Sequence, residues 1–255
     1  MLAGIREILV ITTPHEQAQF RRLLGDGKKW GICLEYAIQY EPKGLAEAFL
    51  IGESFIEDRP VALILGDNIF HGAGMGQTLQ SLPNRNGATV FAQRVNNPHH
   101  YGVVEFENGR VKSLEEKPSN PKSKYVIPGL YFYDNKVVSL AKTLQPSPRG
   151  ELEITDLNLA YLGLGELHVE PLRRGTAWLD TGTIDSLHEA GQFVKVLEQR
   201  QGTKISVPEE IAWRLGYISD QQLAEEASRY PKSGYGAYLL DLLETKETEA
   251  AINLS

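Results

Sequence analysis

Residues 61–70 read VALILGDNIF, a run of apolar side chains that ends at Gly66, Asp67 and Asn68. An apolar run without alternation is typical of a strand that is buried on both faces of a parallel sheet. In open α/β sheets, ligands bind beyond the carboxyl ends of such strands. The stretch therefore predicts an α/β fold and places the Asp67 carboxylate where a binding site is expected. The alternative is that Asp67 only caps a turn.

The segments around this run alternate between strand and helix patterns. Apolar or alternating patterns predict strands over residues 7–12, 34–39, 61–66 and 88–95. Helical patterns bounded by glycine or proline lie between them, over residues 14–27, 44–56 and 75–82. This alternation predicts a doubly wound sheet with helices on its faces.

The pattern changes after residue 100. Asn108-Gly109 is a strong hairpin signal within 101–118, and an aromatic-rich strand is expected over 125–134. The remaining segments are expected as helices 135–144 and 153–163, strands 167–172 and 176–180, and helices 184–200, 208–228 and 234–245. The simplest organisation is a Rossmann-like, doubly wound mixed sheet in an α/β core of residues 1–200, followed by a helical C-terminal appendage of residues 201–255.

The composition excludes some functional classes. A net charge of -7 argues against a nucleic-acid binder, because phosphate backbones require clustered Lys and Arg. Cys33 is the only cysteine, so an internal disulfide is impossible and a reducing cytoplasm is the expected compartment. The longest apolar runs are far too short to cross a bilayer, so no membrane association is expected.

A second carboxylate at a strand end lies in AWLDTGT, residues 177–183. Asp180 ends the expected strand, and Thr183 is a good N-cap for the helix that follows. Paired with Asp67 across a cleft, Asp180 would complete a two-carboxylate Mg²⁺ site, because Mg²⁺ prefers hard oxygen ligands and substrate phosphates. The alternative is that Asp180 shares the capping role of Thr183.

Two cations are suited to a sugar phosphate. Lys117 follows two carboxylates in SLEEKP, and Arg149 lies in a turn within PSPRGELEITD. A planar guanidinium and a lysine point charge are the groups that proteins use to bind phosphate. The alternative is surface ion pairing with the neighbouring carboxylates Glu115, Glu116, Glu151 and Glu153.

Taken together, these segments closely resemble the glucose-1-phosphate thymidylyltransferases of the sugar-nucleotidyltransferase family. The resemblance runs from Met1 to about Leu242 and includes LAGIREILVITTP, QFRRLLGDG, GLAEAFLIGESFI, LGDNIF, YGVVEF, SLEEKP, GLYFYD, PSPRGELEITD, AWLDTGT, EAGQF and RQGTKI. It implies a nucleotide-diphospho-sugar transferase fold and a Mg²⁺-dependent reaction of dTTP with glucose 1-phosphate to give dTDP-glucose and pyrophosphate, for dTDP-rhamnose-type synthesis. It also implies a cytoplasmic homotetramer.

The resemblance assigns a role to each candidate residue. It implies that Asp67 and Asp180 bind Mg²⁺ and that Lys117 and Arg149 hold the phosphate of the sugar. The remaining assignments are Gln39 and Gly44 at the thymine base, Trp178 near the nucleotide, and Tyr101, Gly102 and Glu116 at the glucose ring. The implied chemistry is in-line attack of a glucose 1-phosphate oxygen on the α-phosphorus of dTTP, which relies on positioning and charge stabilisation.

The chain departs from the family pattern at its start. The family begins with a strand, a G-G-x-G-T-R-L loop that holds the triphosphate and a Lys-Pro element, and these 255 residues contain no such loop. MLAGIREILVITTP therefore reads as a sequence that starts at an internal methionine, with two unpaired strand edges and little activity expected. The alternative is a short homologue that binds a sugar phosphate or nucleotide, or assembles with a full-length paralogue, without catalysis.

A second departure concerns the strand expected at 125–134. Ile127-Pro128 is unusual before GLYFYD in this family. Because proline has no N–H, Pro128 cannot donate to the strand ladder, and it biases Ile127 toward an extended conformation. We therefore expect an altered fit on the glucose side of the site.

Overall fold

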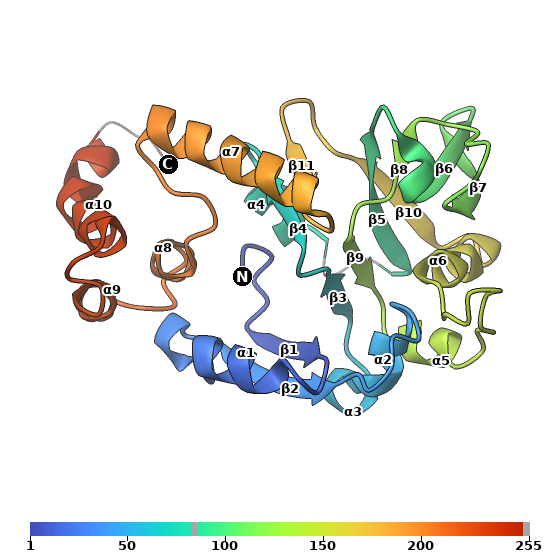
Figure 1. Ribbon diagram of the computed structural model, residues 1–255, viewed down its shortest axis with the longest axis horizontal. Coiled ribbons are helices and arrows are strands. Elements are labelled where there is room, and N and C mark those ends of the chain that lie inside the picture. The colour runs from blue at the N-terminus through green and yellow to red at the C-terminus, as the bar shows by residue number, and fades with distance from the viewer. Residues whose placement is uncertain (83–85, 252–255) are drawn as a thin grey trace.

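The computed structural model describes residues 1–82 and 86–251, with side chains described as far as residue 245 (Figure 1). The strands are β1 (Glu7–Thr12), β2 (Cys33–Ile38), β3 (Val61–Ile64), β4 (Asn68–His71), β5 (Ala88–Arg94), β6 (Gly102–Glu107), β7 (Arg110–Glu116), β8 (Tyr125–Val126), β9 (Leu130–Tyr133), β10 (Leu167–Pro171) and β11 (Ala177–Asp180).

The helices are α1 (Gln17–Leu24), α2 (Glu47–Ile51), α3 (Glu53–Ile56), α4 (Met75–Gln80), α5 (Val137–Ala141), α6 (Ile154–Gly163), α7 (Ile184–Gln201), α8 (Pro208–Arg214), α9 (Asp220–Ser228) and α10 (Gly234–Ala251). Two short 3-10 turns, η1 (Lys28–Trp30) and η2 (Pro98–His100), complete the described elements. No helix in the described part of the chain is both long and apolar enough to span a bilayer.

The central sheet is mixed, as the sequence predicts. It has seven strands in the order β3-β9-β5-β8-β6-β7, with β10 pairing in parallel to β5. The parallel pair β1–β2 and the antiparallel pair β4–β11 form two further sheets. Within the described ranges, β1 and β2 are therefore not hydrogen-bonded to the larger sheet.

Alternate residues of the central strands enter two different cores. In β9, Tyr131 and Tyr133 belong to the larger core under α2, α5 and α6, whereas Leu130 and Phe132 belong to a smaller core near α4. This alternation follows from the two-residue period of a strand. Helical segments thus cover both faces of the sheet, which fits the expected α/β class.

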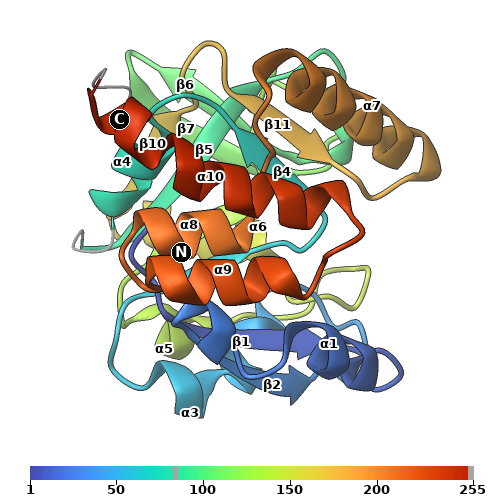
Figure 2. The ribbon, with the colours of Figure 1, turned by 90° about the vertical axis from the view of Figure 1, so that its left-hand side faces the viewer.

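A third core joins the two ends of the chain. Trp30, Ile32 and Leu34 pack against buried residues of α8, α9 and α10, including Leu223 and Leu239. Figure 2 shows α8, α9 and α10 stacked in front of the N-terminal segment, with β1 and β2 below them. The division into residues 1–200 and 201–255 stays a prediction, and this core contains residues from both sides of it.

The 101–118 hairpin is confirmed. β6 and β7 pair antiparallel around Asn108 and Gly109, whose φ angles of 52° and 75° are both left-handed. Two left-handed central residues define the tight turn that suits the right-handed twist of a hairpin, and Asn-Gly adopts it most readily.

The strand expected over 125–134 is interrupted. β8 ends at Val126 and β9 begins at Leu130, with Pro128 between them. On either side of it, the Ile127 N–H donates to the Gly102 carbonyl and the Gly129 carbonyl accepts from the Leu65 N–H, both at 2.9 Å. Pro128 itself has no N–H to donate. Two expected helices are also divided: 44–56 becomes α2 and α3, which meet at Gly52, and 208–228 becomes α8 and α9.

The division of 208–228 has a local cause. The chain turns at Gly216, which has a left-handed φ of 71°, and the Tyr217 N–H donates to the Ala212 carbonyl at 2.8 Å. Ser219 then starts α9 with a capping box, because its side chain accepts from the Gln222 N–H while the Gln222 side chain accepts from the Ser219 N–H. A glycine stop and a serine start together favour two helices over one.

β4 is a strand that the sequence did not predict. It follows directly after Asp67 and pairs with β11, so that Asn68 lies opposite Asp180. The strand expected over residues 61–66 is shorter than predicted, because β3 ends at Ile64. A turn at Gly66-Asp67, closed by the bond from the Asn68 N–H to the Leu65 carbonyl at 3.1 Å, separates β3 from β4, and the β4–β11 pairing brings the Asp67 and Asp180 segments side by side.

Candidate active site

A pocket lies where β4, β7, β11, the β8–β9 connection and α6 meet. Its empty volume is about 620 Å³, open mouth included. Six residues that the sequence singles out line it: Tyr101, Gly102, Glu116, Lys117, Trp178 and Asp180. The other lining residues are Leu45, Leu65, Asn68, His100, Ile127, Gly129, Tyr131, Ile154, Thr155 and Asn158.

The two aspartates converge at one edge of this pocket. The Thr181 N–H and hydroxyl both donate to the Asp67 carbonyl at 2.9 Å, which joins the two strand ends. A methyl group placed on Gly182 would lie 3.1 Å from Asp180 Oδ1 and 3.6 Å from Asp67 Oδ2. The two carboxylates therefore face the same small space.

This donor set fits a divalent cation that is completed by substrate. Mg²⁺ is usually held by one or two carboxylates together with phosphate oxygens and water. Among the side chains that the structure describes, no cluster of three or more His, Cys, Asp or Glu could hold a metal by itself. Asp67 and Asp180 thus suit an open cation site and not a closed structural one.

Asn68 connects the aspartate edge to the pocket wall. Its Oδ1 accepts from the Trp178 indole N–H at 2.6 Å and from the Gly129 N–H at 3.0 Å. Its amide nitrogen donates to Asp67 Oδ1 at 2.8 Å. The sequence analysis gave Asn68 no role beyond ending the apolar run, because its partners Gly129 and Trp178 are distant in sequence.

Tyr101 and Trp178 form the aromatic wall beside Asp180. Their ring centroids are 5.0 Å apart in an edge-on arrangement. Burial raises the pKa of the Tyr101 hydroxyl, and the charge of Asp180 and a hydrogen bond to it raise this pKa further. Tyr101 therefore stays protonated and can donate near the carboxylate edge.

Glu116 is the polar centre of the opposite wall. Its Oε2 accepts from the Thr155 hydroxyl, and its Oε1 lies 3.9 Å from Lys117 Nζ. A methyl group on Gly102 would approach Thr155 Oγ1 to 3.0 Å and Glu116 Oε2 to 3.4 Å. A glycine at 102 leaves these polar atoms open to an occupant of the pocket.

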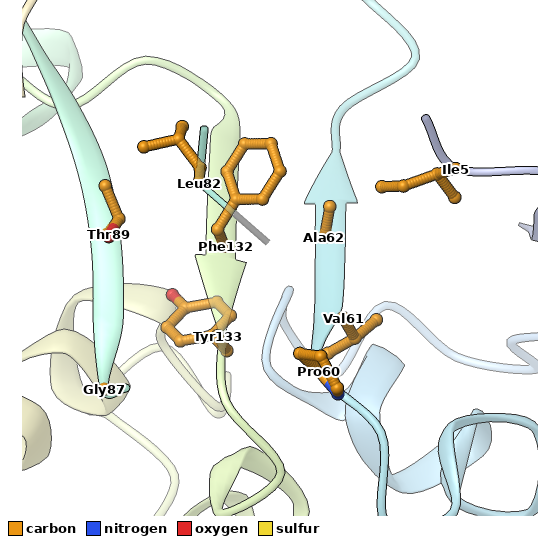
Figure 3. A pocket seen from close by; sticks show the side chains of 9 residues that line it. All are labelled: Ile5, Pro60, Val61, Ala62, Leu82, Gly87, Thr89, Phe132 and Tyr133. Atoms are coloured by element: carbon orange, nitrogen blue, oxygen red, sulfur yellow. The ribbon is translucent and has the colours of Figure 1, made fainter. Parts of the chain in front are cut away.

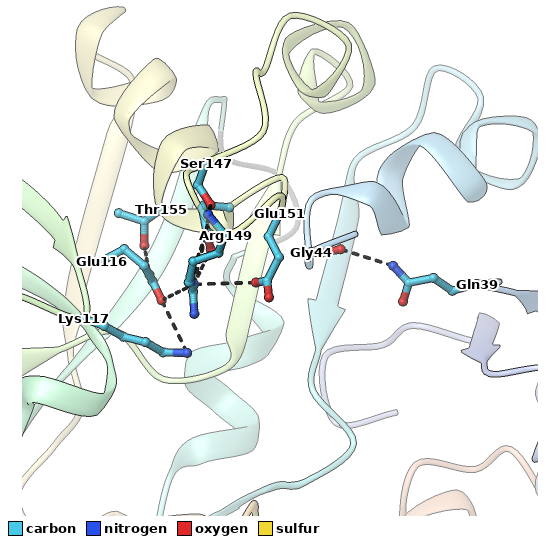
Figure 4. Close-up of polar contacts among 9 residues, drawn as sticks. Gln39, Gly44, Glu116, Lys117, Ser147, Arg149, Glu151 and Thr155 are labelled. Atoms are coloured by element: carbon cyan, nitrogen blue, oxygen red, sulfur yellow. Dashed lines mark hydrogen bonds and ion pairs between the residues drawn. The ribbon is translucent and has the colours of Figure 1, made fainter. Parts of the chain in front are cut away.

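Arg149 lies behind Glu116 within a group of carboxylates (Figure 4). Its Nη2 donates to both oxygens of Glu153 at 2.9 Å and lies 3.7 Å from Glu116 and 3.6 Å from Glu151. The hydrogen bond to Glu153 raises the pKa of Arg149, so the guanidinium is always charged. The ion pairing considered for Arg149 is present, and the shared Glu116 connects Arg149 with Lys117.

A second pocket lies beside β3 (Figure 3). It has an empty volume of about 350 Å³ and is lined by Ile5, Pro60, Val61, Ala62, Leu82, Gly87, Thr89, Phe132 and Tyr133. None of the candidate site residues lines it. Its mostly apolar lining has no charged group, so we assign the chemistry to the first pocket.

Comparison with known proteins identifies the family of the chain. The family model described as nucleotidyl transferase matches residues 1–196. A glucose-1-phosphate thymidylyltransferase of Mycolicibacterium smegmatis is 58% identical over 245 residues, which is 96% of this chain and 85% of the relative. This chain belongs to the nucleotidyl transferase family.

Other relatives support the same assignment. A glucose-1-phosphate thymidylyltransferase of Xanthomonas campestris is 55% identical over 244 residues, covering 95% of this chain and 83% of the relative. A solved Bacillus anthracis structure, described as a glucose-1-phosphate thymidylyltransferase in complex with a sucrose, is 37% identical with a TM-score of 0.69 over 75% of this chain and 77% of its own. A UDP-glucose pyrophosphorylase structure, at 21% identity and a TM-score of 0.65 over 76% of this chain and 82% of its own, shares the fold.

Four of the candidate residues in this nucleotidyl transferase do not line the pocket: Asp67 faces Asp180 at its edge, Arg149 lies behind Glu116, and Gln39 and Gly44 lie farther away. Gln39, beyond β2, donates to the Gly44 carbonyl at 3.3 Å and to Glu47 at 2.7 Å. Figure 4 shows this pair to the right of Glu116 and Arg149, apart from their group of polar contacts. The structure thus brings Gln39 and Gly44 together, and neither lines the pocket.

The Gly44 segment is nonetheless tied to the Arg149 segment. The Leu152 N–H donates to the Lys43 carbonyl at 2.7 Å, and the Ala46 N–H donates to the Leu152 carbonyl at 3.1 Å. Gly44 has a φ of 98°, and a methyl group there would lie 2.4 Å from the Leu152 carbonyl oxygen. Only glycine permits this close contact between the two loops.

Proposed function

We propose that this chain is a glucose-1-phosphate thymidylyltransferase, which converts dTTP and glucose 1-phosphate into dTDP-glucose and pyrophosphate. One observation carries the proposal: Asp180, whose carboxylate faces the same small space as that of Asp67, lines one pocket together with Glu116 and Lys117. The names of the relatives at 58% and 55% identity support the substrates.

The proposed reaction is a single in-line displacement. A phosphate oxygen of glucose 1-phosphate attacks the α-phosphorus of dTTP, a new P–O bond forms, and the bond to the bridging oxygen of the β-phosphate breaks. The electron pair leaves on pyrophosphate, and no protein nucleophile is needed. Such a reaction depends on positioning and on neutralising phosphate charge.

The residues of this chain supply both functions. Glu116 would accept hydroxyl hydrogens of the glucose ring, and Lys117 with Arg149 would hold its phosphate through charge-assisted bonds. Asp67 and Asp180 would hold Mg²⁺, which when bound would neutralise charge on the triphosphate. Trp178 would pack against the nucleotide, and Gln39 and Gly44 would contact its base.

Several finer assignments remain proposals. The choice of dTTP over UTP depends on the names of the relatives. A Mg²⁺ cofactor, a homotetramer, a cytoplasmic location and a role in dTDP-rhamnose synthesis depend on the family resemblance. The absence of contact with nucleic acid or membranes is likewise an expectation from composition.

The test is pyrophosphate release from dTTP, with UTP in parallel, in the presence of glucose 1-phosphate and Mg²⁺. Charge-neutralising groups contribute about 10³–10⁵ to kcat in phosphoryl transfer, so Asp67→Asn and Asp180→Asn should each lower kcat by about 10³-fold. Asp185→Asn, an exposed carboxylate in the first turn of α7, is the matched control and should retain the wild-type rate.

The assay also separates this enzyme from a homologue that only binds. Glucose 1-phosphate binding by calorimetry without any pyrophosphate release would reject catalysis and favour the binding role. Full activity in both Asp67→Asn and Asp180→Asn would reject the assigned cation site while leaving the overall reaction in place.

A further inference from the structure

Asn158 is a buried polar residue in the floor of the active-site pocket. It lies on α6 with a fully buried side chain and is one of the residues that line the pocket. Thr155, three residues earlier on α6, also lines the pocket and donates to Glu116. Residues three apart share one face of a helix, so Asn158 lies one turn from the Glu116 contact.

The carbonyl oxygen of the Asn158 side chain accepts a hydrogen bond, whereas its nitrogen does not donate one in the described structure. The Tyr133 hydroxyl donates to Asn158 Oδ1 at 2.7 Å, and Tyr133 is not among the residues lining this pocket. The other end, Asn158 Nδ2, is a buried nitrogen with no hydrogen-bond partner in the part of the chain that the structure describes. Buried polar groups are nearly always hydrogen-bonded, so this donor requires a partner.

The surroundings define the chemistry of that partner. Thr155 uses its hydroxyl hydrogen on Glu116, and Glu116, Tyr131 and Asn158 line the same pocket, so these groups face one space. An alcohol hydroxyl can accept from Asn158 and donate to Glu116 at the same time; water can do the same, but of the two only the hydroxyl is part of the sugar substrate. A fully ionised phosphate oxygen can only accept, and an apolar group can do neither.

We propose that Asn158 Nδ2 donates to a hydroxyl of the sugar ring and makes the site selective for sugars that carry that hydroxyl. The proposal rests on the proposed function, because it assigns the sugar to this pocket. A site with a buried donor rejects an analogue that lacks the matching hydroxyl, since the donor is then left unpaired.

The first experiment uses the wild-type protein and four analogues: the 2-, 3-, 4- and 6-deoxy derivatives of glucose 1-phosphate. The readouts are kcat/KM for pyrophosphate release and Kd from calorimetry without nucleotide. An unpaired buried donor should weaken one analogue by about 5- to 150-fold. If no analogue is weakened by more than about twofold, the proposal is overturned without any variant.

Variants then assign that discrimination to Asn158. Asn158→Asp keeps an acceptor for Tyr133 and replaces the donor, whereas Asn158→Leu removes both. In each variant, the ratio of kcat/KM for glucose 1-phosphate to kcat/KM for the one weakened deoxy analogue should fall to within about twofold of unity. The KM for dTTP should stay unchanged. Tyr133→Phe is the control: it removes the bond at the other end of the amide and should keep the wild-type discrimination.

The outcomes separate this proposal from the proposed function. A structural role for Asn158 would weaken glucose 1-phosphate and all four analogues equally, and that result overturns the proposal even when the enzyme is active. Glucose 1-phosphate binding with the expected discrimination, but without turnover, supports Asn158 and rejects catalysis. If wild-type protein does not bind glucose 1-phosphate, both fail.

Discussion

Asp134 shows how one buried carboxylate holds three segments together. It lies just after β9, and its side chain accepts from the Gly87 N–H at 2.9 Å, the Tyr161 hydroxyl at 2.8 Å and the Lys136 N–H at 3.0 Å. Burial by itself would raise the pKa of this carboxyl, but the three hydrogen bonds outweigh it and leave the pKa below its ordinary value. The negative form is therefore the one that stabilises the fold.

Asp134→Asn should reduce stability in a pH-dependent way. Losing the charge weakens several charge-assisted bonds, so the unfolding free energy should fall by about 3 kcal/mol at pH 7. Because the folded pKa is depressed, the contribution of Asp134 is full above its unfolded pKa of about 3.9 and is lost as pH falls through the folded value. Urea unfolding between pH 3 and 7 measures this difference.

The control for Asp134 is Asp58→Asn, which changes an exposed carboxylate and should shift stability by less than about 0.5 kcal/mol. A stability difference between wild type and Asp134→Asn that stays constant down to pH 3 would contradict a charge-based role.

At the same scale, candidate residues at recognisable strand ends could be picked out from the sequence, whereas two amides could not. Glu116, Lys117 and Asp180 follow or end recognisable strands, and all three line one pocket. Asn68 and Asn158 escaped notice because an amide acts only through its partners. Those partners, such as Gly129 for Asn68, lie far along the chain.

At the scale of elements, the strands were predictable because their burial patterns are local. The order β3-β9-β5 was not, since it pairs Val61 with Tyr133 and Ala88 with Tyr133 across long sequence separations. β4 escaped prediction because it follows the apolar run of β3 after only a short turn at Gly66-Asp67. The missing ladder donor at Pro128 was predictable because proline has no N–H.

The loop contact at Gly44 gives an element-scale prediction. Gly44→Ala adds a methyl group 2.4 Å from the Leu152 carbonyl oxygen at a φ of 98°. Backbone strain of about 1–2 kcal/mol and a clash of about 1–3 kcal/mol should together lower the unfolding free energy by more than about 2 kcal/mol. Since this contact joins the Arg149 loop, KM for glucose 1-phosphate should also rise.

Gly165→Ala is the matched control for the Gly44 variant. Gly165 also has a left-handed φ, 72°, but an added methyl group meets nothing within 4 Å. It should lose only the strain of about 1–2 kcal/mol and leave KM unchanged. Equal destabilisation in the two variants, measured by urea unfolding, would show that the loop contact is unimportant.

At the scale of the whole molecule, the chain builds two units around separate cores. The seven-stranded sheet, its helices and the β4–β11 pair hold the candidate active site, while β1, β2 and the C-terminal helices share a third core (Figure 1). Glu209 connects the ends of the chain within that core, because it accepts from the Trp30 indole N–H at 3.0 Å and from the Tyr235 hydroxyl. The sequence analysis treated the C-terminal helices as an appendage and missed this contact, which spans 179 positions.

Trp30→Phe should therefore lower the local stability of the unit formed by β1, β2 and the C-terminal helices and leave the unit around the seven-stranded sheet unchanged. Glu209 is 2% exposed, so losing a donor to its buried carboxylate should cost about 1.5–3 kcal/mol. Hydrogen exchange should speed up across β1, β2, α8, α9 and α10 but remain unchanged in β5 and β9, because local opening follows cooperative units. Trp213→Phe, whose indole bonds the exposed Asp220, is the control and should change exchange little. Faster exchange in β5 and β9 as well would mean that the two cores unfold as one unit, and the kcat of the variant would then fall together with its stability.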